Sequence, residues 1–154
     1  MTVFESVVSV QLPPYLFQSV APERYALVDR FYRAQGYKVK CTEQEKLFVL
    51  CLPTGELIAA VRLVPQGSGH YWLRNLLVAP EWRNGGLASA LLNHLKPAIA
   101  PYGCYFFALP HLLGLYQRLD FDRNPSHCPA DIAAIYEKYR SRGRDWVLMG
   151  YIQR

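Results

Sequence analysis

The chain has 154 residues, of which 51% are hydrophobic and 19% are charged, and it carries a formal net charge of +5. This composition excludes an intrinsically disordered chain, and the length predicts a single domain over residues 1–154 with one sizeable core. The sequence contains no run of five or more lysines and arginines. The positive charge therefore favours anionic partners in general without predicting a nucleic-acid-binding tail.

The four cysteines lie at positions 41, 51, 104 and 128, and none of them forms a Cys-x-x-Cys pair. This spacing excludes a zinc ribbon and a thioredoxin-type motif, so we expect no metal site. No basic segment followed by an apolar run opens the chain, and no apolar stretch reaches the roughly 18 residues of a membrane span. We therefore expect a cytoplasmic protein with reduced thiols and no membrane association.

The first half of the chain predicts a strand, a helix and an antiparallel meander of three strands. Residues 3–10 are rich in valine and predict the first strand, which ends before Pro13 and Pro14. Pro22 suits the first turn of a helix, apolar residues continue it at helical spacing, and Gly36 ends it. Short loops then separate three β-prone runs, at residues 46–52, 57–64 and 71–78.

The second half alternates helices and strands. A helix over residues 87–99 places a leucine or isoleucine at every fourth position, which predicts one buried face. After it we expect a strand at 104–109, a short helix from Pro110, a strand from Phe121, a helix from Pro129 and a last strand at 146–152. This order predicts an α/β fold, a mixed sheet with helices on its faces.

The most informative stretch is residues 78–88, which read Val-Ala-Pro-Glu-Trp-Arg-Asn-Gly-Gly-Leu-Ala. A strand ends at a proline, and a pair of glycines then opens directly into the helix over 87–99. The first N–H groups of a helix have no partner inside the helix, and they lie at the positive end of its dipole. The stretch therefore predicts an anion site that suits a phosphate.

Three kinds of phosphate site compete for this turn. A Walker P-loop needs Lys-Ser/Thr directly after the second glycine, where this chain has Leu87 and Ala88. A dinucleotide fingerprint needs G-x-G-x-x-G and a later acidic residue, and neither is present. The remaining alternative is the pyrophosphate site of an enzyme that uses acyl-coenzyme A.

The stretch resembles the GNAT superfamily of N-acyltransferases, whose motif Arg/Gln-x-x-Gly-x-Gly/Ala follows a strand ending in Val-x-Pro. Residues 78–80 and 83–88 match every defined position of this pattern. The family's Tyr-x-x-x-Gly-Phe element is matched by residues 116–121, except that Asp120 replaces the glycine. Aspartate tolerates the left-handed conformation, so we expect the turn to survive. The resemblance extends over about residues 20–154, with motif agreement over 71–121.

The resemblance implies a GNAT-like three-layer fold with a central, mostly antiparallel sheet of about seven strands. Helices would cover both faces, and acetyl-CoA, the co-substrate, would lie between two splayed central strands, residues 71–78 and 104–109. The backbone of Leu76 and Val78 would pair with the pantetheine arm. The pyrophosphate would be held by the turn and helix start, namely Arg83, Asn84, Gly85, Gly86, Leu87, Ala88 and Ser89.

The resemblance also implies that Tyr116 is the general acid, since a phenol is protonated at neutral pH and can protonate the departing thiolate. The general base is left open, because the strand over 71–78 contains no carboxylate. His70, His111 or a water chain ending on backbone carbonyls are the alternatives. Cys104 lies in an apolar strand without a paired histidine, which argues against a covalent intermediate.

The acceptor pocket is expected to involve residues 25–37 together with Tyr71 and Trp72. Arg62 and Arg74 lie on neighbouring predicted strands. They attract an acidic acceptor if they face the cleft, and otherwise belong to an exposed sheet face or a core salt bridge. The helix predicted at 129–140 either covers the acceptor site or forms a homodimer contact.

The resemblance thus implies an N-acetyltransferase that moves an acetyl group from acetyl-CoA to a primary amine of a small molecule, peptide or protein. The amine would attack directly in a ternary complex. The missing strand carboxylate and Asp120 favour an alternative, a non-catalytic module that binds acyl-CoA or another protein. Nucleic-acid binding is a third alternative that rests on charge alone.

Overall fold

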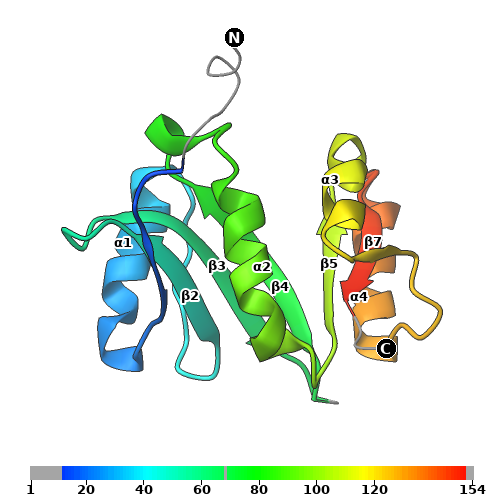
Figure 1. Cartoon of the computed structure of the whole chain (residues 1–154). Coiled ribbons are helices and arrows are strands. Elements are labelled where there is room, and N and C mark those ends of the chain that lie inside the picture. Colours follow the sequence, from blue (N-terminus) through cyan, green and yellow to red (C-terminus); the bar gives the residue numbers. More distant parts are fainter. Residues whose placement is uncertain (1–11, 68, 152–154) are drawn as a thin grey trace, which may run out of the picture.

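The computed structural model describes residues 12–67 and 69–151, which form a seven-stranded sheet in the order β1-β2-β3-β4-β5-β7-β6 (Figure 1). The strand predicted at residues 3–10 lies outside the described residues, and the first described strand follows the two prolines instead. The strands are β1 (Leu16–Ser19), β2 (Lys46–Cys51), β3 (Leu57–Pro65), β4 (Tyr71–Val78), β5 (Cys104–Ala108), β6 (Asp122–Arg123) and β7 (Val147–Tyr151).

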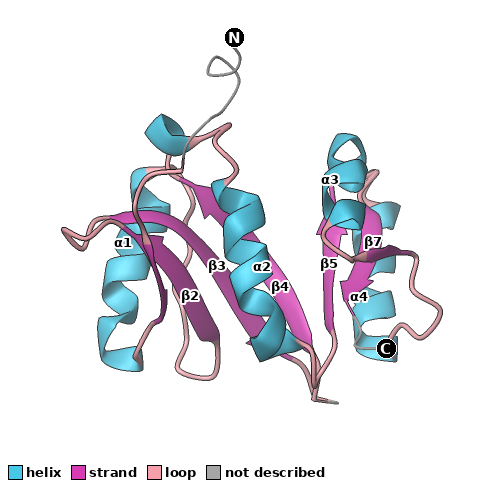
Figure 2. Ribbon diagram, viewed as in Figure 1, coloured by secondary structure: helices cyan, strands magenta, loops and turns pink. Residues whose placement is uncertain are grey.

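Helices cover both faces of the sheet (Figure 2). The α-helices are α1 (Tyr25–Ala34), α2 (Leu87–Ile99), α3 (Leu113–Arg118) and α4 (Ala130–Ser141). Three short 3-10 turns, η1 (Pro22–Arg24), η2 (Pro80–Trp82) and η3 (Pro110–Leu112), each begin at a proline. No helix within the described residues has the length and apolar character needed to cross a membrane.

The alternation of β2 shows which helix covers which face, because successive side chains of a strand point to opposite sides. Leu47 and Val49 pack against α1, whereas Phe48 and Leu50 pack on the side of α2. The predicted stripe of α2 is confirmed, since its leucines and Ile99 are at most 2% exposed.

The side chains of strand β5 also alternate between the two helix-covered faces of the sheet. Phe106 packs with α2 and α3, whereas Tyr105 packs with Ile132 of α4. One face of the sheet is therefore covered by α2 and α3, and the other by α1 and α4. The predicted elements of the second half are confirmed, with α4 inserted between β6 and β7.

The sheet has one irregular junction, between β4 and β5. The strands β1 to β4 form an antiparallel meander, and β5 pairs antiparallel with β7. Strand β4 meets β5 in parallel, and only at Tyr71↔Cys104 and Trp72↔Tyr105. Beyond these two pairs the strands diverge, as Figure 1 shows. The expectation of splayed central strands is therefore confirmed.

Candidate active site

The diverging strands leave the second half of β4 with a free edge. The N–H of Ala79 donates to the carbonyl of Ile58 on β3 at 2.8 Å. In a trans peptide the carbonyl points opposite to the N–H, so the carbonyl of Val78 points away from β3, toward the diverging β5. Strand alternation places the backbone of Leu76 on the same edge. Both residues expected along a pantetheine arm thus present their backbone to the opening.

Arg83 closes the end of this edge. Its Nε donates to the carbonyl of Val78 at 2.9 Å, and its Nη2 donates to Oε1 of Gln35 at 3.1 Å. The guanidinium therefore joins the end of β4 to the residue that follows α1. Arg83 directly precedes the glycine turn, and its contacts are those of a residue that positions the turn.

The glycine turn presents backbone donors at the start of α2. Asn84 and Gly86 both adopt the left-handed conformation, with φ of +65° and +86°. The first helical hydrogen bond runs from the N–H of Ala90 to the carbonyl of Gly86 at 3.0 Å, and no side chain caps the helix. The N–H groups of Leu87, Ala88 and Ser89 precede that bond. They lie at the positive end of a helix with no acidic residue in its first turn, which suits an anion.

The diverging strands β4 and β5 form a fork. Tyr116 lies on α3 and packs against β5. Its ring packs edge-on against Phe106 of β5, with 4.6 Å between the ring centroids. Burial raises the pKa of its phenol above the ordinary value, so the group remains protonated at neutral pH.

The turn that follows α3 survives the replacement of glycine. Asp120 has a φ of +71°, and the N–H of Phe121 donates to the carbonyl of Tyr116 at 3.0 Å. The carboxylate of Asp120 also pairs with Lys96 of α2 at 2.9 Å. The expectation that aspartate would keep this turn is therefore confirmed.

The two histidines considered as general bases, His70 and His111, lie at opposite ends of the fork. His70 is 5% exposed and lies at the closed end, where its Nε2 is 2.9 Å from Oδ1 of Asp131 on α4. This contact makes His70 an anchor of α4 and speaks against its expected role as a base. His111 is exposed in η3, beyond the end of β5. Cys104 is fully buried, and burial raises the pKa of its thiol, which argues further against a covalent intermediate.

A buried polar network lies beside the fork, on the side of α1. Arg62 binds Glu45 with both ends of its guanidinium, Nε to Oε1 at 2.7 Å and Nη2 to Oε2 at 3.0 Å. Its Nη1 donates to Oδ1 of Asn75 at 2.7 Å, and the hydroxyl of Tyr32 donates to the backbone carbonyl of Asn75 at 2.8 Å. Arg62 therefore forms a salt bridge in the core. This excludes the alternative in which Arg62 attracts an acidic acceptor.

The network holds a distortion of β4. Asn75 has a φ of +55°, and the pairing of β3 with β4 shifts register between Ala60 and Arg62. Glu45 and Asn75 were not predicted as part of the site. The sequence carries no signal for them, because their contacts join segments whose spacing follows no helical or strand period.

A cavity of about 160 Å³ opens on the same face, where β4 and β5 begin to diverge. Trp72 lines this cavity, whereas Tyr71, which was expected beside it in the acceptor pocket, packs in the core on the opposite face of the sheet. Residues of α4 and of the segment after it close one wall. The cavity is lined by Trp72, Leu73, Arg74, Asn75, Phe107, Tyr139 and Trp146.

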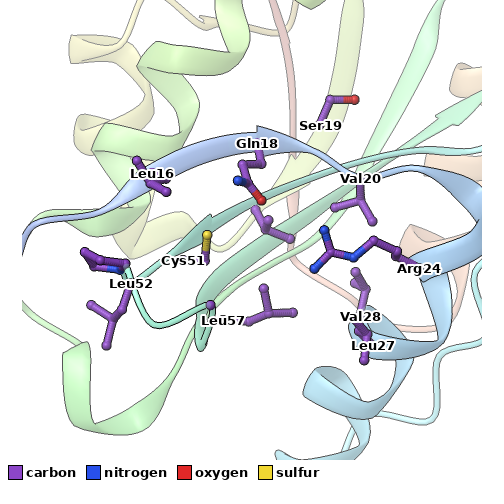
Figure 3. A pocket seen from close by; sticks show the side chains of 13 residues that line it. Leu16, Gln18, Ser19, Val20, Arg24, Leu27, Val28, Cys51, Leu52 and Leu57 are labelled. Atoms are coloured by element: carbon purple, nitrogen blue, oxygen red, sulfur yellow. The ribbon is translucent and has the colours of Figure 1, made fainter.

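A second hollow, of about 170 Å³, lies at the far edge of the sheet between β1, α1 and the β2–β3 turn (Figure 3). The side chains of Gln18, Arg24 and Cys51 line it. Strands β3 and β4 separate it from the fork, so it is not part of the site. Within residues 12–67 and 69–151, no group of three or more His, Cys, Asp or Glu side chains is placed to hold a metal ion.

A sheet that forks between two parallel strands, with a glycine turn and a helix start at the open end, defines the class of acyl-CoA N-acyltransferase folds. Residues 9–121 match the model of the acetyltransferase (GNAT) family. The chain therefore belongs to the GNAT family of acetyltransferases.

Solved structures share the fold at low sequence identity. Escherichia coli ElaA has a TM-score of 0.63 at 13% identity, over 90% of this chain and 99% of that one. The ribosomal-protein-S18-alanine N-acetyltransferase of E. coli has a TM-score of 0.62 at 17% identity, over 90% and 93%. N-acetylglutamate synthase from Neisseria gonorrhoeae, in complex with coenzyme A and N-acetyl-glutamate, has a TM-score of 0.59 at 16% identity, over 92% and 35%. No curated protein sequence matches the chain.

Proposed function

We propose that this protein is an N-acetyltransferase that transfers an acetyl group from acetyl-CoA to a primary amine in a ternary complex. The observation that carries this proposal is the fork itself. Strand β4 diverges from β5, a helix start that suits an anion follows β4, and the half-buried Tyr116 packs on β5, in a member of the GNAT family.

In this proposal the donor is held by backbone groups. The edge of β4 at Leu76 and Val78 pairs with the pantetheine amides as an added strand would, beside the hydrogen bond from Arg83 to the carbonyl of Val78. The N–H groups of the glycine turn and of the start of α2, residues 84–89, bind the pyrophosphate. Arg83 fixes the turn through Val78 and Gln35.

In this proposal Tyr116 is the general acid of the chemical step. The amine nitrogen forms a bond to the thioester carbonyl carbon, the carbon–sulfur bond breaks, and the phenol protonates the leaving thiolate. The attacking nitrogen loses one proton, which returns to the tyrosinate through solvent. The strand β4 offers no carboxylate to take that proton, so water held on backbone carbonyls at the fork is the proposed route.

The test is thiol release from acetyl-CoA across a panel of amino acids, polyamines, aminoglycosides and peptide N-termini, with the product identified by mass spectrometry. Transfer to at least one amine class supports the proposal. Hydrolysis of acetyl-CoA alone, or no release with any acceptor, contradicts it.

A second candidate function is a module that binds acyl-CoA without catalysis. Two observations favour it: β4 has no carboxylate, and His70 is bound to Asp131. Calorimetric binding of CoA without thiol release on any acceptor supports this second candidate.

We also propose a cytoplasmic location. Cys41, Cys51, Cys104 and Cys128 are all free thiols, which suits a reducing compartment.

A further inference from the structure

Arg74 is a half-buried cation that forms no ion pair with the other described residues. Its guanidinium carbon lies 4.2 Å from the ring centroid of Trp72. The ion pairs among the described residues involve Arg62, His70, Lys96 and Arg140 as the basic partners, and none includes Arg74. Burial lowers the pKa of Arg74, but an arginine remains charged in a protein.

The neighbouring cation makes this position more unusual. Arg74 lies directly opposite Arg62 in the β3–β4 register, and like charges in that relation destabilise a sheet. Arg62 is balanced by both oxygens of Glu45. The unbalanced positive charge of the pair therefore lies on Arg74. An anion bound there would offset the free-energy cost of burying Arg74 and the repulsion between Arg74 and Arg62.

The position of Arg74 ties this charge to the acceptor side of the fork. The last β4–β5 pair is Trp72↔Tyr105, and Arg74 and Phe107 are the next residues of the two strands on that same face. Both line the 160 Å³ cavity under α4. The helix α2, whose start forms the anion site for the donor, covers the opposite face of the sheet.

Of the six other residues that line the cavity, four are aromatic, and the remaining two are Leu73 and Asn75. The ring of Tyr139 lies 5.7 Å from that of Phe107 and 4.9 Å from that of Trp146, and Trp72 lies 5.8 Å from Phe107. Such walls suit a compact apolar group beside the charge. A volume of this size admits a small molecule and not a folded protein segment.

We propose that the amine acceptor is a free amino acid, or an equally small amino carboxylate, whose carboxylate binds the guanidinium of Arg74 and whose side chain packs in the aromatic cavity. This inference rests on the proposed acetyltransferase function and names its substrate class. The planar guanidinium can bind both carboxylate oxygens. The amino group then lies toward the open edge of β4, where Leu76 and Val78 hold the donor.

The proposal excludes polyamines as preferred acceptors. A second ammonium group entering the cavity would meet the guanidinium of Arg74, and none of the described residues that line the cavity carries a carboxylate. Spermidine is therefore expected to be a poor acceptor.

The test compares each of the twenty amino acids with its amide, together with spermidine, in the thiol-release assay. An amide keeps the side chain and loses the negative charge, and because its amine also has a lower pKa, each acid and amide are compared at equal concentrations of unprotonated amine. We expect the acid to exceed its amide in kcat/KM by about ten- to a hundredfold, the effect of a hydrogen bond to a charged group. Arg74→Gln should abolish this preference, mainly through KM, and Arg74→Lys should retain part of it. Arg144→Gln, which removes an exposed arginine beside Trp146, is the matched control and should keep it.

A second measurement separates this inference from the proposed function. Thermal unfolding is recorded with CoA present, with and without each amino acid and each amide, for wild type and Arg74→Gln. Stabilisation by acids in wild type only supports the carboxylate site even where no acceptor turns over. Transfer to amides equal to that of acids, an unchanged preference in Arg74→Gln, or the absence of any stabilisation by acids overturns it. If Arg74→Gln fails to bind CoA, the wild-type preference and Arg74→Lys decide the result.

Discussion

Tyr116 is the residue whose environment bears most directly on the proposed chemistry. Its ring is held between Phe106 and Phe121, so the position of its hydroxyl is set by aromatic packing. Removing that hydroxyl should change proton transfer and leave the packing intact. Two predictions follow from this placement, one for a substitution and one for pH.

We expect Tyr116→Phe to lower kcat about 100-fold or more, the usual contribution of a general acid. The Kd for CoA, measured by calorimetry, should stay within about twofold, because the predicted CoA contacts are backbone groups on β4 and α2. Tyr102→Phe, on an exposed loop tyrosine, is the control and should retain full activity. An unchanged kcat in Tyr116→Phe would remove Tyr116 from the mechanism.

The raised pKa of Tyr116 predicts the shape of the pH profile. A general acid acts in its protonated form, and burial moves the phenol pKa above its ordinary value of 10.0. The phenol of Tyr116 is therefore fully protonated throughout the neutral and mildly alkaline pH range. We expect kcat/KM to rise with pH as the acceptor amine loses its proton, and to show no descending limb below pH 10. A descending limb between pH 7 and 9 that is present in wild type and absent from Tyr116→Phe would contradict the raised pKa of Tyr116.

At the scale of elements, the glycine turn and α2 act as one unit. Gly86 has a left-handed φ and is the residue from which α2 begins. A β-branched residue is a strong outlier in this conformation. A β-branched residue at this position would therefore shift the turn and its backbone donors.

We expect Gly86→Val to weaken CoA binding at least tenfold, because the helix start must shift to relieve the strained φ. Gly55→Val is a matched control, since Gly55 has a φ of +95° in the distant β2–β3 turn and open space around it. Both variants should lose similar thermal stability, and only Gly86→Val should lose CoA affinity by calorimetry. Equal affinities in the two variants would show that the turn does not bind CoA.

At the scale of the whole molecule, the network of Glu45 and Arg62 joins the segment before β2 to β3 and to the distorted part of β4. Burial acts to raise the pKa of Glu45, and hydrogen bonds from Arg62 and Thr42 outweigh it, so the pKa lies below the ordinary value of 4.5. A carboxyl group of this kind stabilises the folded state above pH 4.5, and the stabilisation is lost as pH falls through its folded pKa.

We expect Glu45→Gln to lower the free energy of unfolding at pH 7 by about 3 kcal/mol, because it leaves the charge of Arg62 buried and unbalanced. The measurement is urea unfolding at pH 7 and at pH 4. The difference between wild type and variant should shrink at the lower pH. Glu43→Gln, which changes an exposed neighbour, should alter the free energy by less than about 0.5 kcal/mol. A similar loss in both variants would contradict the role of the network.

The helices, the meander and the donor turn could be predicted because their signals are local. The apolar stripe of α2 repeats every four residues, and the glycines before it fix a turn within a few positions. The site around the fork could not be predicted in the same way. Tyr71 and Trp72 are adjacent in sequence, yet one packs in the core and the other lines the cavity, because the strand period sends them to opposite faces.

The sequence by itself determined the fold class, the family and the proposed donor half of the site, because a strand, a glycine turn and a helix start are contiguous. Only the tertiary structure decided the proposed acceptor half. Register places Arg62 opposite Arg74, Glu45 neutralises the first and leaves the second charged, and α4 docks through Asp131 and His70 to wall the cavity. These pairings join residues distant in sequence. They are set by strand register and helix docking, which no spacing along the chain encodes.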